Sequence, residues 1–467
     1  MMSSRHSPDN RFLIAPTGRL FFANALPMML VMTMNGLLNV VDATFLGYFV
    51  GTNALAAVSI VFPVFMITVA LSTLVSGGMS SLLARHLGAD ARDQAAAVFA
   101  RAHGLALCTS LTLIAIFLVG GRAGVGYLAD GQNGITEMAH TYLSIMIYAT
   151  PVQFLLGLHA DTWRNEGRAG LMALMSVGVT LANIALNYVL IVILELGVAG
   201  SAWGTVLAQG LGLGLLIGLR LRGGSGLLPL NSLGKCRWTG GWRPILALGA
   251  PLSLSFIGIA FVSATLIATL KLTAEAGYAD TIAAYGIVTR IFSFTFLPLM
   301  AIALATQSIA GNNVGAGLYL RSDAVLRLAL GTALLYCIAV EIILLGSSHH
   351  IGAGFVRNQV VVAQVGAILR PMVYFYLFVG PLLVLALYFQ AVGQPGRAAA
   401  LTLAKPLLLC PVLIVALGFI NGAEAIWFAF PIADGLVASL AIVIVIASLK
   451  RHRAGSGFGL AIQGEPT

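Results

Sequence analysis

The sequence predicts an all-α integral membrane protein, with twelve transmembrane helices in two pseudo-symmetric six-helix bundles around a central cleft. Composition is the first reason: 59% of the 467 residues are hydrophobic and 9% are charged, which is more apolar surface than a soluble domain can bury. The second reason is a series of apolar segments, each long enough to cross a bilayer. The third is a repeat, because residues 55–89 align with residues 282–316 at a constant offset of 227 without a gap.

The predicted spans are separated by turns that contain charged residues or Gly and Pro. Each span contains about 20 or more predominantly apolar residues, the length that a bilayer core requires. They cover residues 20–47, 54–83, 95–119, 137–163, 168–195, 198–220, 243–271, 281–310, 324–346, 361–392, 397–419 and 424–449.

The repeat extends over both halves of the chain. Pro27 and Pro251 lie near the start of the first helix of each copy, and the turn at residues 164–167 matches the turn at residues 390–393. Six helices per half make the halves parallel, related by an axis along the membrane normal. Duplicated membrane proteins of this kind form their ligand site between the two halves, so the repeat indicates a transporter.

Basic residues predict the orientation. With the N-terminus inside, the cytoplasmic turns contain most of the Lys and Arg residues, so both termini are predicted to be cytoplasmic. The net charge of +9 then reflects topology and not nucleic-acid binding, since the charges are spread along short turns. The predicted organisation is a cytoplasmic N-terminal segment (1–19), an N-lobe (20–220), a cytoplasmic linker (221–242), a C-lobe (243–450) and a cytoplasmic tail (451–467).

Several other classes of protein and site are not indicated. The first 19 residues do not resemble a cleavable signal, and the four Cys residues have no paired spacing that would predict a disulfide or a metal site. No Gly-rich run is followed by Lys-Ser or Lys-Thr, and no arrangement of nucleophile, general base and oxyanion donors is visible. We therefore expect no enzyme activity, no cofactor and no nucleic-acid partner.

Asp42 is the sharpest candidate for a functional residue. It lies late in the first predicted helix, where an isolated charge is costly and burial favours the protonated form. Asp42 is thus a candidate proton carrier, or a cation ligand if other oxygens converge on it. Asn183 and Asn187 are candidate partners, because their spacing of four places them on one side of the fifth helix. The structural alternative is that Asp42 caps the outer end of its helix in the headgroup layer.

The C-lobe contains a different set of intramembrane charges. Glu341, on the ninth helix, could form an internal ion pair with Arg290 on the eighth or Arg370 on the tenth, and direct binding of substrate is the alternative. Lys405, on the eleventh helix, could extend toward the cytoplasm or face the central cavity. Asp434, on the twelfth helix, has no evident partner in the sequence.

Several motifs resemble those of the multidrug and toxic compound extrusion (MATE) family of antiporters. Pro27 followed fifteen residues later by Asp42 is similar to the family's first-helix kink and acidic site. Further motifs similar to the family follow in order at residues 53–59, 77–78, 88–90, 183–188, 197–205, 282–290 and 422–427. The resemblance covers roughly residues 20–450, and the nearest branch is that of the DinF-like and MepA-like bacterial proteins.

The resemblance implies a secondary active antiporter of the bacterial inner membrane. Such a protein exports small hydrophobic, usually cationic molecules by alternating access in exchange for H⁺ or Na⁺, and we expect a monomer whose other partner is membrane lipid. The resemblance also implies a helix kink at Pro27. The coupling-ion site that it implies consists of Asp42, Asn183, Asn187, Tyr142 and Thr205.

The chain also differs from the family pattern. Many relatives carry a second Asp on the fifth helix, where this chain has Asn187, and the seventh and tenth helices contain no Asp or Glu. Asp42 is then the only evident coupling carboxylate. The basic residues of the C-lobe support an alternative, a lipid or lipid-linked oligosaccharide flippase of the same superfamily, because a cationic cavity suits phosphate groups. These residues are Arg290, Arg370 and Lys405.

Overall fold

The computed structural model describes residues 10–128, 133–222, 228, 233–273, 278–355, 359–449 and 460. Within them, ten helices are long and apolar enough to cross a membrane, and two bent helix pairs raise the number to twelve when each pair is counted as one span. These residues contain no strand. The prediction of an all-α protein with up to twelve membrane-spanning helices is therefore confirmed. Residues 1–9, much of the predicted linker and nearly all of the predicted tail lie outside the described residues.

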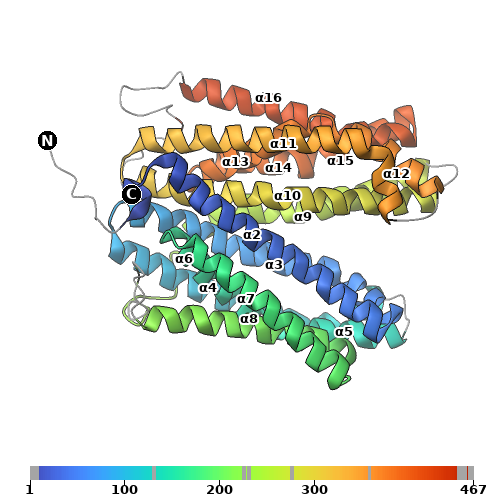
Figure 1. Cartoon of the computed structure of the whole chain (residues 1–467), viewed down its shortest axis with the longest axis horizontal. Helices are drawn as coiled ribbons and strands as arrows, with labels where there is room; N and C mark the ends of the chain where they lie inside the picture. Colours follow the sequence, from blue (N-terminus) through green and yellow to red (C-terminus); the bar gives the residue numbers. More distant parts are fainter. Residues whose placement is uncertain are drawn as a thin grey trace. The chain divides into compact units, whose positions relative to one another are not determined.

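The first half of the chain contains helices α1 to α8 (Figure 1). The bounds are α1 (Arg11–Ile14), α2 (Thr17–Phe45), the π-helical turn η1 (Leu46–Val50), α3 (Thr52–Gly88), α4 (Arg92–Leu128), α5 (Asn133–Tyr148), α6 (Thr150–Asn165), α7 (Ala169–Asn187), the π-helical turn η2 (Tyr188–Ile193) and α8 (Gly197–Leu221).

The second half contains helices α9 to α16. The bounds are α9 (Arg243–Thr273), α10 (Tyr278–Gly315), α11 (Tyr319–Phe355), α12 (Gln359–Val373), the 3₁₀ turn η4 (Tyr376–Phe378), α13 (Val379–Ala391), α14 (Pro395–Leu403), the π-helical turn η5 (Ala404–Leu409), α15 (Cys410–Asn421), the 3₁₀ turn η6 (Ala423–Phe428) and α16 (Ala429–Leu449).

The predicted repeat recurs in the packing and in the turns. Helix α3 contacts α4, α5 and α6, and α10 contacts α11, α12 and α13 in the same way. The turns after α3 and α10 each contain a residue with a positive φ, 54° at Asp90 and 72° at Gly317, which are 227 positions apart. The turn hydrogen bonds recur at the same offset: Ala91 N–H donates to His86 O, and Leu318 N–H donates to Asn313 O.

Two predicted helices are broken. The prediction of one helix over residues 137–163 differs from the structure, in which α5 and α6 meet at an angle of 47°. Pro151 lies in the first turn of α6, where its missing N–H costs nothing, whereas within a continuous helix it would remove a hydrogen bond. The predicted helix over residues 361–392 bends by 52° between α12 and η4, where Phe375 adopts a left-handed conformation with a φ of 66°.

The chain divides into two compact units. The first contains the chain up to Ala15 and Phe22–Ser253, and the second contains Pro16–Phe21 and the chain from Leu254. Helix α8 ends and α9 begins at the edges of the predicted linker, but the first third of α9 belongs to the first unit. The reason is close packing on α3: a side chain at Gly78 would overlap the main chain of Ile245, and one at Gly249 would overlap that of Leu74.

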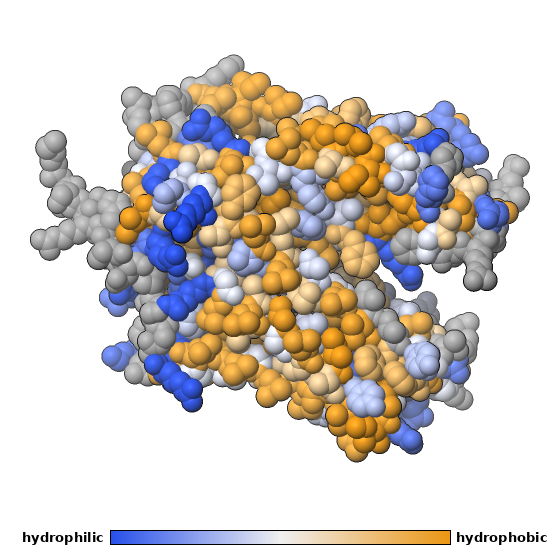
Figure 2. Space-filling model, viewed as in Figure 1, coloured by the Kyte–Doolittle hydropathy of each residue, from blue (hydrophilic) through white to orange (hydrophobic). Residues whose placement is uncertain are grey.

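Apolar surface covers the sides of the helices, and hydrophilic residues gather near helix ends (Figure 2). Many large hydrophobic side chains are exposed along single helices; on α8, for example, Leu207, Leu211 and Leu215 are each about half exposed. Such a surface is stable against lipid tails and unstable in water.

The first unit contains a buried ion pair that the sequence did not predict. Arg220 forms two hydrogen bonds with Glu166, at 2.9 and 3.2 Å, and lies over the ring of Trp163. The same two side chains bind the main chain of Leu228, through its carbonyl oxygen at 2.7 Å and its N–H at 3.2 Å. The pair therefore holds a residue of the predicted linker against the end of the bundle.

Replacement of Glu166 with Gln is expected to destabilise the first unit, because it leaves the buried Arg220 charge without its counter-ion. Loss of one partner of a buried pair costs about 3–5 kcal/mol, which corresponds to a decrease of roughly 10 °C in unfolding temperature. Tryptophan fluorescence during heating of the detergent-purified protein measures this. The matched control is Asp90→Asn, whose pair with Arg92 is about half exposed and contributes little. Equal unfolding temperatures for the two variants would contradict the prediction.

Candidate coupling site

Asp42 lies near the end of a long helix, as the sequence predicts. Helix α2 continues through Asp42 to Phe45 and widens into the π-helical turn η1, which ends at Val50 and is followed by Gly51 with a φ of 116°. The side chain of Asp42 is half-buried. Among the described residues, no ion pair includes Asp42. Its carboxylate is instead held by neutral hydrogen-bond donors.

Helix α7 supplies the two predicted amides. Asn183 and Asn187 are fully buried and lie one turn apart at the end of α7, immediately before the π-helical turn η2. Asn187 Nδ2 donates to Asp42 Oδ1 at 2.6 Å and to Asn183 Oδ1 at 3.2 Å. One amide thus joins Asp42 to the second amide.

Helix α8 closes the group with Thr205. The Thr205 hydroxyl donates to Asp42 Oδ2 at 3.2 Å and accepts from Asn183 Nδ2 at 3.2 Å. Asp42, Asn183, Asn187 and Thr205, here called the Asp42 cluster, therefore form a closed ring of hydrogen bonds between α2, α7 and α8. The structure brings together four of the five residues predicted for the coupling site.

One oxygen of the Asp42 cluster has no partner. Asn187 Oδ1 is buried and accepts no hydrogen bond from any group in the described part of the chain. A buried acceptor without a donor is costly, and a bound cation or water removes that cost. The cluster therefore offers an anionic carboxylate beside a free amide oxygen, which is the chemistry of a site for a small cation.

Gly204 is a residue of this site that the sequence analysis missed. A side chain at Gly204 would overlap Asn187 Oδ1, so the absence of one allows α7 to approach α8 at the cluster. Gly200, one turn earlier on α8, lies against the main chain of Leu190 in the same manner. Small residues four apart are typical of close helix contacts in membranes, and Gly200 and Gly204 carry that signal.

Tyr142 and Pro27 stand apart from the ring. The ring of Tyr142 packs among apolar residues of α3, α4 and α5 and beside Leu46, Ala54 and Val198, and within the described part of the chain no hydrogen bond joins its hydroxyl to the cluster. Pro27 lies inside α2, where it cannot donate a hydrogen bond to the preceding turn. A helix with this missing bond bends more easily.

The charges of the second unit have other partners than those expected. Glu341 accepts a hydrogen bond of 2.9 Å from the N–H of Leu377, and Arg370 Nε donates to Ser348 Oγ at 3.1 Å. Arg290, on α10, is exposed. Lys405 is joined to Asp434 by an ion pair of 2.6 Å. Asp434 thus has the partner that the sequence did not reveal.

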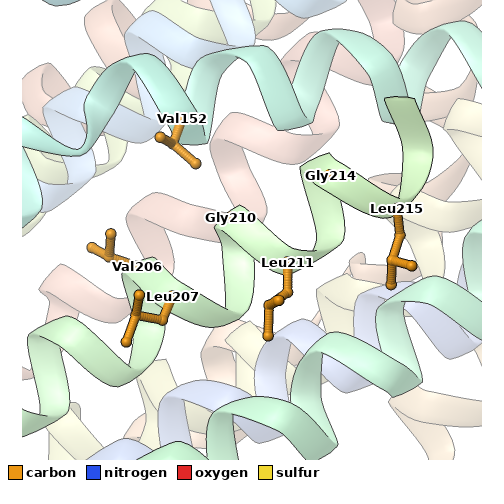
Figure 3. A pocket seen from close by; sticks show the side chains of 7 residues that line it. All are labelled: Val152, Val206, Leu207, Gly210, Leu211, Gly214 and Leu215. Carbon is orange, nitrogen blue, oxygen red and sulfur yellow. The ribbon is translucent and has the colours of Figure 1, made fainter. Parts of the chain in front are cut away.

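A shallow groove of about 520 Å³ lies elsewhere on the first unit, between α6 and α8. Figure 3 shows aliphatic side chains around it, with space left by two glycines of α8. Its lining residues are Val152, Val206, Leu207, Gly210, Leu211, Gly214 and Leu215. None of these side chains binds a charge or donates a hydrogen bond, so the groove is not an ion site.

Comparison with known protein families shows which family has this architecture. The family model described as MatE matches the chain twice, over residues 27–189 and 251–415. Together these segments cover more than half of the chain, and they begin at Pro27 and Pro251. The chain belongs to the MATE family.

Two relatives of this MATE protein come from bacteria. It is 26% identical over 380 residues to the probable multidrug resistance protein YoeA of Bacillus subtilis, covering 79% of this chain and 80% of YoeA. It is 24% identical over 437 residues to the multidrug export protein MepA of Staphylococcus haemolyticus, covering 91% and 93% of the two chains.

A solved structure shares the fold. It is described as the outward-facing conformation of a multidrug resistance MATE family transporter of the MOP superfamily. The TM-score is 0.85 at 21% sequence identity, over 94% of this chain and 97% of that chain. The MATE protein is accordingly a multi-span membrane transporter, and its family is not a family of enzymes. The comparisons do not favour the flippase alternative.

Proposed function

We propose that this MATE protein is a multidrug efflux antiporter that exports hydrophobic, cationic compounds in exchange for H⁺ or Na⁺ by alternating access. The observation that carries the proposal is the Asp42 cluster, in which a carboxylate without an ion-pair partner among the described residues is joined to Asn187 and Thr205. The names of the relatives YoeA and MepA support the class of cargo. A monomer in the bacterial inner membrane, with cytoplasmic termini and no cofactor besides the coupling ion, belongs to the same proposal.

Both candidate ions fit the chemistry of the Asp42 cluster. Hard cations take oxygen ligands, and Na⁺ would find the carboxylate of Asp42 and the unpartnered oxygen of Asn187. A proton would instead neutralise Asp42 at a depth where a charge is costly. The hydrogen bond of Thr205 can adapt to that change, because a hydroxyl both donates and accepts.

Coupling requires that ion and cargo exclude each other or favour different states of the transporter. With Asp42 as the single exchanging carboxylate, one H⁺ enters for each monovalent cation that leaves, and no net charge crosses the membrane. The membrane potential then contributes nothing. One pH unit supplies ~1.4 kcal/mol, enough for about a tenfold gradient of cargo.

The test is ethidium transport by proteoliposomes that contain the purified protein, with a pH gradient and a Na⁺ gradient imposed separately. We expect one of the two gradients to drive transport and thereby to identify the coupling ion. A set of hydrophobic cations broadens the assay beyond ethidium. Absence of gradient-driven transport of every such cation, by protein that unfolds cooperatively on heating, would overturn the proposal.

A further inference from the structure

The second unit contains a buried ion pair whose cationic member is the more accessible one. Lys405 Nζ lies 2.6 Å from Asp434 Oδ1. The side chain of Lys405 is 30% exposed, whereas that of Asp434 is 5% exposed. Of the two side chains, that of Lys405 is therefore the one that other molecules can contact.

Both residues lie deep in candidate membrane spans. Lys405 is in the middle third of the span Pro395–Asn421, and Asp434 is in the middle third of the span Ala423–Leu449. Charged side chains at this depth lie toward the bundle interior or a water-filled cavity, because lipid tails cannot solvate them. The exposed part of Lys405 is thus accessible to polar solutes, at the depth where transporters bind their cargo.

The backbone at Lys405 is irregular and fixed in place. Lys405 belongs to the π-helical turn η5 and precedes Pro406, which has no N–H. A side chain at Gly258 of α9 would lie 2.8 Å from Pro406 Cβ, so α9 packs tightly against this turn. Single π-helical turns inside α-helices are frequent at functional sites, and irregular backbone at membrane depth occurs where it borders protein or a cavity.

We propose that Lys405 is a recognition site for the carboxylate of the transported compound, so that the cargo includes zwitterions and organic anions as well as cations. This inference rests on the proposed function as an exporter. A carboxylate that contacts the Lys405 ammonium group on the side away from Asp434 lies farther from Asp434 than from the ammonium group. Attraction therefore exceeds repulsion, since both decrease with distance.

Two matched dyes test the proposal. Rhodamine 19 has a free carboxylate, and rhodamine 6G is its ethyl ester with the same cationic ring system. Fluorescence anisotropy measures the binding of each dye to the full-length protein in detergent. We expect Lys405→Met combined with Asp434→Asn to weaken the binding of rhodamine 19 about tenfold, the value of a charge-assisted hydrogen bond, and to leave rhodamine 6G unchanged.

One single variant should change the binding of rhodamine 19 in the direction opposite to that of the double variant. Asp434→Asn removes the repulsion and should strengthen rhodamine 19 binding, whereas Lys405→Arg keeps the cation and should preserve it. A purely structural role for the pair would weaken both dyes together in every variant. The double variant replaces the pair with neutral groups of similar volume, so its fold is expected to persist, and its unfolding temperature checks this.

Two results would overturn the inference: failure of the wild type to bind rhodamine 19, or equal rhodamine 19 affinities for the wild type and the double variant. These results can be told apart from a failure of the proposed function. If rhodamine 6G is exported but the affinity for rhodamine 19 does not depend on Lys405, only the proposed carboxylate site is wrong. If no gradient drives transport of either dye or of ethidium, the proposed function as an exporter is wrong.

Discussion

Replacement of Asp42 with Asn is expected to reduce gradient-driven ethidium export to the rate of vesicles without the protein. The substitution removes the carboxylate that takes up the ion but keeps a side chain of the same shape. Asn187 can still donate to the oxygen of the new amide, and the Thr205 hydroxyl, which both donates and accepts, can accept from its N–H group, so the bundle is expected to fold. The measurement is the initial rate of export under the gradient that drives the wild type.

Two further variants at carboxylates complete this test. Asp42→Glu retains a carboxylate and should retain measurable export. Asp93→Asn removes an exposed carboxylate at the start of α4, away from the cluster, and should export at the wild-type rate. Export at the wild-type rate by Asp42→Asn would sink the assignment of this residue as the coupling group.

Replacement of Gly204 with Ala is expected to lower gradient-driven export at least about tenfold. The added methyl group would overlap Asn187 Oδ1 and displace the amide that donates to Asp42. Excess volume at a tightly packed contact destabilises the fold by about 1–3 kcal/mol. At this position it would also distort the geometry of the Asp42 cluster. The initial rate of ethidium export is again the measurement.

Gly210→Ala is the matched control on the same helix. A methyl group at Gly210 meets no atom within 4 Å, and Ala is the better helix former, so this variant should export normally and remain folded. Equal losses in Gly204→Ala and Gly210→Ala would show that α8 tolerates no added volume at all. The specific role of Gly204 beside Asn187 would then be wrong.

Much of the architecture is predictable because it follows from local patterns. Long apolar segments and the repeat at an offset of 227 residues predict the number of spans and the duplication of the bundle. The breaks between α5 and α6 and between α12 and η4 are harder to predict. Pro151 is compatible with a helix start or a kink, and the left-handed conformation of Phe375 has no signal in the sequence.

The Asp42 cluster is predictable in part. A spacing of four places Asn183 and Asn187 on one side of α7, but only the resemblance to the MATE family connected them with Asp42 and Thr205. Contacts between residues on different helices depend on how the helices pack. The periodicity within one helix does not predict that packing.

The partners of Asp434 and of Glu166 were missed for the same reason. Each lies on another helix, at Lys405 and Arg220, and the sequence separation gives no hint of the contact. Gly204 is a further case, because its spacing from Gly200 signals a close helix contact but does not show that the contact is with Asn187.

The assignment of the start of α9 to the first unit affects the order in which the protein can assemble during synthesis. Chains are made from the N-terminus, and units generally fold as they emerge. When α8 has been made, the surface of α3 around Leu74 and Gly78 still lacks its covering segment, which arrives only with residues 243–253. Conversely, Pro16–Phe21 is made early but belongs to the unit that is completed last. The two halves of the gene therefore encode a repeat, but neither half alone encodes a finished folding unit.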